Sequence, residues 1–142
     1  MYDLEKTGKI IADIEHYFDN LKELKVNSPV MTTERFYSLS MVLFALLNRT
    51  IDLGQEIIRG KKLGMPASYK EIFQILAREK IISEGISQKL QHLANQRNVL
   101  AHEYFDVTEK SIYAIYLKIN ALTEFVSIVK ALLLSKNNGR KK

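Results

Sequence analysis

The residues best equipped for chemistry lie together in the segment RNVLAHEY, residues 97–104. An arginine binds phosphate through a planar fork of N–H donors that stays charged at any physiological pH. A histidine is the side chain best suited to proton transfer near neutral pH. Cleavage of a phosphodiester without a metal needs both functions. Arg97 and His102 are therefore the first catalytic candidates, with Asn98 and Tyr104 beside them.

The spacing of Arg97 and His102 constrains the element that carries them. At 100° per residue, a continuous helix would point the two side chains about 140° apart. We therefore predict that the helix ends or distorts between them, near Leu100 and Ala101. Arg97 would then lie in the last turn, with His102 and Tyr104 on the exit segment, and the bend would free backbone groups for a substrate.

Each of these residues also has a purely structural interpretation. An arginine or histidine near the C-terminus of a helix complements the helix dipole. Asn98 can be a surface residue or a local cap, and Tyr104 can bury its ring while its hydroxyl stays in water. Asp52, between two apolar residues of an expected helix, either forms an ion pair with Arg97 across two helices or is simply exposed.

Composition limits the class of protein and of site. The 142 residues, 46% of them hydrophobic and 26% charged, fit one soluble domain with a real core. The absence of cysteine excludes disulfides, thiolate nucleophiles and Cys-ligated zinc. His102 and Asp106 are spaced like a metal pair, but a third ligand is not evident, so we expect no metal and no cofactor.

The N-terminus contains acidic residues and does not have the form of a signal peptide. The longest apolar run, residues 41–47, is too short to span a bilayer. We therefore expect a cytoplasmic protein.

The net charge of +5 is concentrated at the C-terminus. The last eight residues, SKNNGRKK, hold four basic residues and no acid. The rest of the chain holds the other 17 of the 21 basic residues and all 16 acidic residues. The folded part is thus nearly neutral, and its charge is weak support for a nucleic-acid partner. We expect residues 1–134 to form one helical domain and residues 135–142 to be a flexible basic tail.

Apolar residues recur at steps of three and four along most of the chain, which predicts amphipathic helices. Thr32 or Thr33, Ser68 and Thr108 can cap three of these stretches, and a fourth starts near Ser83. Alternating runs bounded by tight turns, the signal for strands, are missing. We predict an all-α, up-and-down bundle of about five helices, at residues 10–24, 33–59, 69–76, 83–97 and 109–133.

The segment 97–104 resembles the R-x-x-x-x-H-x-Y motif of the HepT-like toxins, within the HEPN superfamily of helical ribonucleases. The resemblance covers most of the chain. Asp52 on the second helix, the G-x-P-x-S-Y pattern at residues 64–69 and the aliphatic last helix are all similar to that family. Gln96 departs from the pattern, which has an apolar residue before the arginine.

The resemblance implies a metal-independent ribonuclease that is the toxin of a toxin–antitoxin pair. Arg97 would bind the scissile phosphate, His102 would act as general base or acid, and Asn98 would orient His102 or the phosphate. The partner would be an MntA-like nucleotidyltransferase antitoxin that adds AMP to Tyr104. AMP would bring bulk and negative charge to the place of the RNA phosphate and so block it. The family also implies a homodimer whose two motifs face one cleft.

Two alternatives stay open at the level of sequence. The chain could be a HEPN-type helical module that binds nucleotide or RNA without cleaving it. It could also be a helical adaptor partnered with a nucleotidyltransferase. Cleavage, binding without turnover, and insensitivity to changes at Arg97 and His102 distinguish the three hypotheses.

Overall fold

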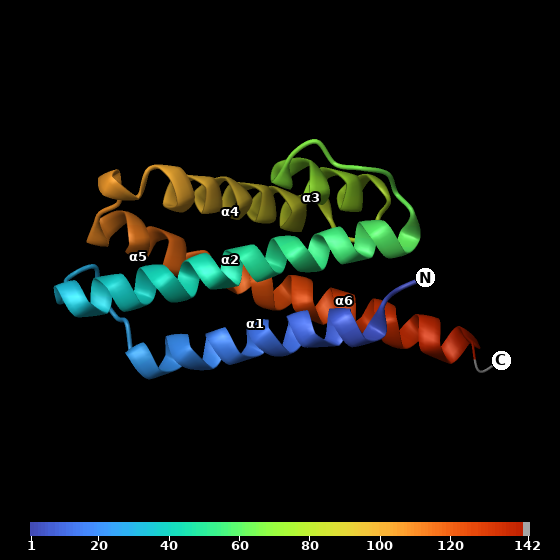
Figure 1. Cartoon of the computed structure of the whole chain (residues 1–142), viewed down its shortest axis with the longest axis horizontal. Coiled ribbons are helices and arrows are strands. Elements are labelled where there is room, and N and C mark those ends of the chain that lie inside the picture. The colour runs from blue at the N-terminus through green and yellow to red at the C-terminus, as the bar shows by residue number, and fades with distance from the viewer. Residues whose placement is uncertain (141–142) are drawn as a thin grey trace.

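The protein is a bundle of α-helices that run roughly along the long axis of the molecule (Figure 1). The computed structural model describes residues 1–140, apart from the side chains of Tyr104 and of residues 136–140, and no strand is present among them. The elements are α1 (Leu4–Leu24), α2 (Thr33–Lys61), α3 (Tyr69–Arg78), α4 (Glu84–His102), the short 3₁₀ helix η1 (Tyr104–Asp106), α5 (Glu109–Leu117) and α6 (Asn120–Arg140). The predicted all-α, up-and-down class is confirmed.

Helix starts follow the expected caps. The first N–H groups of a helix have no partner within the helix, and a side-chain oxygen just before it satisfies one of them. Four helices begin in this way, with hydroxyl oxygens accepting from the backbone N–H three residues later, at Thr32, Ser68, Ser83 and Thr108. Local chemistry therefore defines where α2, α3, α4 and α5 begin.

Helix α2 is the centre of the bundle and packs against α1, α3, α4 and α5. Leu39, Leu43, Leu46 and Ile57 along it are fully buried. Its length and mean hydropathy of 1.2 over 18 residues would suffice to cross a membrane. A core helix surrounded by its neighbours meets the same criterion, so this observation is weak support for a membrane span.

The last predicted helix is divided into α5 and α6. Between them the backbone tightens to bonds across three residues, with the Lys118 N–H donating to the Ile115 carbonyl at 2.9 Å. Ile119 in this junction is 4% exposed. The apolar stripe thus continues through the junction, which is why periodicity predicted one helix. Helix α6 extends to Arg140, while the expected basic tail lies mostly outside the described side chains.

Candidate active site

Three helices hold the guanidinium of Arg97. Arg97 is half-buried on α4, and its Nε donates a hydrogen bond of 2.7 Å to Oδ1 of Asn48 on α2. The guanidinium carbon lies 5.3 Å from the ring centre of Phe44 on α2 and 5.1 Å from that of Tyr69 on α3. Cations are attracted to aromatic faces at such distances. The planar head of Arg97 is therefore fixed in position and orientation.

Among the described residues, every partner of this guanidinium is electrically neutral. Besides Asn48, its Nη1 donates to Oδ1 of Asn98 at 3.4 Å. Within the described part of the chain, no carboxylate lies within ion-pair distance of Arg97. Amide oxygens and aromatic faces position a cation without neutralising it. The positive charge of Arg97 is thus available to an anionic ligand.

Of the two interpretations of Asp52, the ion pair with Arg97 is wrong. Asp52 instead accepts a hydrogen bond of 3.1 Å from Arg49, three residues earlier on α2, and Arg49 also binds Asp13 on α1 at 2.6 Å. Asn48 lies one helical turn before Asp52, and it is this turn of α2 that meets Arg97. The sequence therefore indicated the right helix and the wrong turn.

Asn48, Phe44 and the stacking role of Tyr69 were missed by reasoning from the sequence. Phe44 and Asn48 are four residues apart and share one face of α2. The available signal was an amide at the end of the apolar run MVLFALL, since a partly buried amide needs a hydrogen-bond partner. Tyr69 entered the sequence argument only as part of the G-x-P-x-S-Y pattern.

The predicted break between Arg97 and His102 is also wrong, because α4 is continuous through His102. The N–H of Glu103 donates to the carbonyl of Val99 at 2.8 Å, an ordinary helical bond across the expected break. Leu100, 9% exposed, anchors this last turn in the core. Within one chain, Arg97 and His102 therefore project about 140° apart.

His102 is exposed on the last turn of α4, and its side chain makes no hydrogen bond or ion pair with the described residues. Asn98 lies one turn earlier on the same face and is also exposed. Asn98 thus lies beside both Arg97, which it contacts, and His102. Tyr104 begins η1 in the backbone, but its side chain lies outside the described residues, so its expected role stays a prediction.

The other two histidines lie on other parts of the surface. His16 on α1 packs beside Tyr17, with ring centres 5.8 Å apart. His92 on α4 contacts the Lys118 ammonium at 3.2 Å. Among the described residues, no group of three or more His, Asp and Glu side chains could hold a metal ion.

The chain is similar to one protein family and to a curated relative. Residues 8–129 match the family described as Ribonuclease HepT-like. The chain is 26% identical over 82 residues to the mRNA nuclease HepT of Shewanella oneidensis. That match spans 57% of this chain and 62% of the Shewanella protein, which is less than two thirds of that relative's length.

Solved structures share the fold over nearly the whole chain. The cytosolic protein YutE from Bacillus subtilis, of unknown function, has a TM-score of 0.83 and 24% identity, covering 96% of this chain and 95% of YutE. A tri-AMPylated HEPN toxin from Shewanella oneidensis, solved with its MNT antitoxin, has a TM-score of 0.80 and 22% identity, covering 92% and 99%. These likenesses show the fold alone. The family match over residues 8–129 goes further, and the chain belongs to the HepT-like ribonuclease family.

Proposed function

We propose that this protein is a metal-independent ribonuclease toxin in which Arg97 binds the scissile phosphate of RNA. One observation carries the proposal: the guanidinium is held by Asn48, Phe44 and Tyr69, all neutral, and so keeps its charge for an anion. A fixed cation that needs no reorganisation stabilises the charge that develops on a phosphate in the transition state. The family name and the Shewanella nuclease support the same activity.

His102 supplies the proton transfer in this proposal. The ribose 2′-oxygen attacks phosphorus and loses its proton, and the bond to the 5′-oxygen breaks as that oxygen gains one. An exposed imidazole without a hydrogen-bond partner among the described residues can act at either oxygen, as base or as acid. Asn98, between Arg97 and His102 on the surface, would orient the phosphate or the imidazole.

A second copy of the chain completes the site. Because α4 is continuous, one chain does not direct Arg97 and His102 to a common point, whereas two facing copies can supply both groups to one phosphate. Tyr37 and Met41, 63% and 75% exposed, precede Phe44 and Asn48 on the same face of α2. Exposed apolar side chains beside the Arg97 site support a homodimer with a shared cleft.

The partner in this proposal is an MntA-like nucleotidyltransferase antitoxin that adds AMP to Tyr104, in the cytoplasm. The Shewanella toxin with a similar fold is described as tri-AMPylated and in complex with an MNT antitoxin, and YutE is described as cytosolic. Tyr104 follows His102 by two residues, so an attached phosphate would add negative charge beside the site. Incubation with ATP and the nucleotidyltransferase should add AMP to wild-type protein and not to Tyr104→Phe.

Cleavage of single-stranded RNA in the presence of EDTA tests the activity. We expect His102→Ala to lower the cleavage rate by about 10²- to 10⁴-fold, the usual contribution of a general acid or base. His16→Ala is the matched control, because His16 is also an exposed helical histidine. Cleavage by His102→Ala at the wild-type rate, or cleavage that EDTA abolishes, would contradict this mechanism.

Binding of RNA without cleavage is the second candidate function. The observation that favours it is the divergence of Arg97 and His102 on the continuous helix α4. This alternative predicts that Arg97→Ala loses RNA affinity while His102→Ala changes nothing that can be measured. Turnover by the wild-type protein decides between the two.

A further inference from the structure

The same face of α4 that carries Asn98 and His102 also carries amide side chains further towards its start. Gln88, Gln91 and Asn95 precede Asn98 at steps of three and four residues, so all of them lie on one stripe of a continuous helix. Asn95 lies about 4.5 Å along the axis from Asn98 and about 10 Å from His102. A molecule that is bound at Asn98 can therefore reach this stripe.

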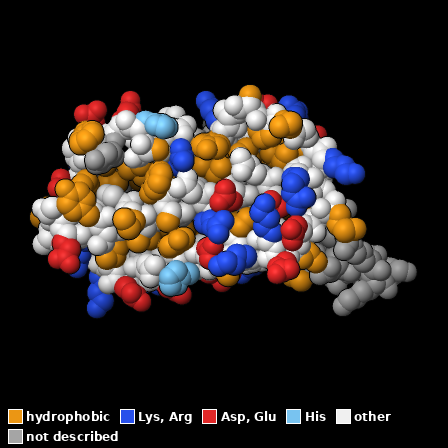
Figure 2. All heavy atoms as spheres, in the orientation of Figure 1, with side chains coloured by type: hydrophobic (Ala, Val, Ile, Leu, Met, Phe, Trp, Pro, Cys, Tyr) orange, Lys and Arg blue, Asp and Glu red, His pale blue; other side chains and the backbone are white. Residues whose placement is uncertain are grey.

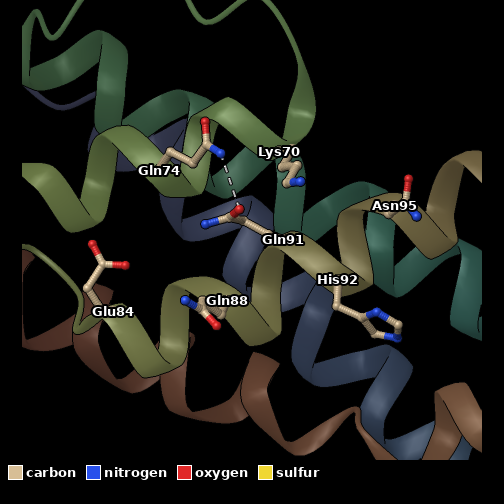
Figure 3. A pocket seen from close by; sticks show the side chains of 7 residues that line it. All are labelled: Lys70, Gln74, Glu84, Gln88, Gln91, His92 and Asn95. Atoms are coloured by element: carbon tan, nitrogen blue, oxygen red, sulfur yellow. Dashed lines mark hydrogen bonds between the residues drawn. The ribbon is translucent and has the colours of Figure 1, made fainter.

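The stripe forms one wall of a polar groove, and α3 supplies the other (Figure 3). The groove has a volume of about 610 Å³, within the range of small-molecule sites. Its lining includes four amides, Gln74, Gln88, Gln91 and Asn95, together with Lys70. Figure 3 shows Gln74 and Lys70 on α3, opposite the amides of α4.

Gln91 is a lining residue of the groove on α4, and hydrogen bonds fix the position of its side chain. Its Nε2 donates to Oγ of Ser87 at 2.9 Å, and Ser87, fully buried, donates to the Phe73 carbonyl at 2.7 Å. Its Oε1 accepts from Gln74 across the groove at 3.3 Å. Gln88 and Asn95 make no hydrogen bond with the described residues, so each has an amide N–H₂ and a carbonyl free for a ligand.

The groove continues into the Arg97 site at one end. The link is on α3, where Lys70 lines the groove and follows Tyr69, whose ring stacks on Arg97. Glu84, the groove's carboxylate, lies at the far end, near the start of α4 (Figure 3). The only cation among the lining residues that the structure describes, apart from His92, is Lys70, beside the proposed phosphate site.

His92 adds a further hydrogen-bonding group. Burial, and then the nearby charge of Lys118, lower its pKa. Lys118 can only donate, so Nε2 of His92 accepts and Nδ1 carries the proton. The groove is therefore lined by paired donors and acceptors with little net charge, which suits nucleobase edges better than phosphates.

We propose that the groove between α3 and α4 is a base-binding subsite for single-stranded RNA next to the phosphate held by Arg97. The inference rests on the proposed function for the identity of the ligand. Amides match the donor and acceptor edge of a base such as adenine, and they read unpaired bases in RNA. The subsite would give the enzyme a preference for the base beside the cleaved bond.

Binding of uncleavable RNA tests this subsite without relying on turnover. The probes are 2′-O-methyl oligonucleotides about 12 nucleotides long, carrying only A, only U, only C, or no bases, with affinity measured by fluorescence anisotropy. We expect wild-type protein to bind the A oligonucleotide about tenfold more tightly than the abasic one. The double variant Gln88→Ala and Asn95→Ala should remove most of that difference.

Two further variants separate the contribution of bases from that of charge. Gln55→Ala, a matched change at an exposed amide of α2, should leave the base preference intact. Lys70→Gln should weaken all four oligonucleotides alike and lower the salt dependence of binding by about one charge, as loss of a phosphate contact does. The Gln88 and Asn95 double variant should leave the salt dependence unchanged.

The outcomes distinguish this inference from the proposed function. Equal affinity for base-containing and abasic oligonucleotides, or a base preference that survives the double variant, overturns the subsite even if RNA is cleaved. Base-dependent binding lost in the double variant upholds the subsite even if no cleavage is found. Unchanged RNA binding together with lost binding of the nucleotidyltransferase would overturn the proposal and assign the groove to a protein partner.

Discussion

Arg49 and Arg97 are both held by side chains of neighbouring helices, but the charge of their partners differs. Arg49 binds two carboxylates, Asp13 at 2.6 Å and Asp52 at 3.1 Å, so its charge is balanced. Arg97 binds Asn48, the residue just before Arg49, and stacks on two rings, so its charge is not balanced. The ion pairs of Arg49 connect α1 and α2, whereas the neutral contacts of Arg97 leave its charge available to a ligand.

The same contrast extends over the surface. Figure 2 shows basic and acidic side chains intermixed over the centre and right of this face, with apolar side chains gathered towards the left. The ion pairs include Glu56, 5% exposed, which binds Lys6 at 2.9 Å and Arg59 at 2.7 Å. Burial raises the pKa of Glu56, but hydrogen bonds and charges from Arg59 and Lys6 outweigh it and lower the pKa overall. These ion pairs stabilise the fold.

The largest predicted effect comes from replacing each of the two arginines in turn. Arg97→Gln should lower RNA cleavage by about 10²- to 10³-fold, the cost of losing one group that stabilises transition-state charge. It should leave the thermal unfolding midpoint nearly unchanged. Arg49→Gln should do the reverse, lowering that midpoint by a few degrees while cleavage stays near wild type. Cleavage rates and thermal melts are the two measurements.

Equal loss of cleavage in both variants would show that the two arginines act as one network, and the contrast between them would fail. Arg78→Gln is a control for loss of surface charge, since Arg78 is exposed on α3 and its side chain makes no hydrogen bond or ion pair with the described residues.

A smaller effect should follow from making the surroundings of Arg97 like those of Arg49. Asn48→Asp places a carboxylate where an amide oxygen lies 2.7 Å from Nε of Arg97. The new ion pair neutralises the guanidinium, so affinity for uncleavable RNA should fall by about tenfold while the fold is not weakened. Asn27→Asp adds the same charge in the connector between α1 and α2 as a control. Undiminished RNA affinity in Asn48→Asp would mean that the free charge of Arg97 is not what binds RNA.

Most helix starts and buried faces could be predicted from the sequence because their signals are local. Thr32, Ser68 and Ser83 cap helices within three residues of their own positions, and apolar periodicity marks the buried faces. The partners of Arg97 depend instead on which turns of α2 and α3 meet α4, a matter of tertiary packing. Asp52 and Asn48 differ by one turn, and periodicity alone does not distinguish them.

The predicted break in α4 failed for a different reason. It followed from requiring Arg97 and His102 to converge within a single chain. Nothing local favours a break there, because Val99, Leu100 and Ala101 are ordinary helix residues and Leu100 is buried. The divergence of the two side chains is therefore informative, since it directs attention to a second copy of the chain.

The ion pairs of Glu56 lead to a prediction about stability in acid. The pKa of Glu56 is lower in the folded protein than its ordinary 4.5, so its contribution to stability is complete above about pH 4.5 and is lost as pH falls through the lowered value. Glu56→Gln should reduce the free energy of unfolding by about 1 kcal/mol at pH 7. It should also flatten the loss of stability below pH 4.5. Urea unfolding between pH 3 and 7 measures both, and parallel pH profiles of variant and wild type would contradict the assignment.

The smallest predicted effect concerns the aromatic contacts of the Arg97 guanidinium. Tyr69→Leu removes a ring 5.1 Å from the guanidinium carbon while keeping an apolar side chain at a half-buried position. A cation–π contact at a partly exposed site contributes about 0.5–1 kcal/mol, so RNA affinity should fall by about two- to fivefold with the rate of the bound complex little changed. Tyr69→Phe keeps the ring and should bind like wild type. Equal losses in both variants would transfer the effect from the ring of Tyr69 to its hydroxyl, and the cation–π contribution of Tyr69 would be ruled out.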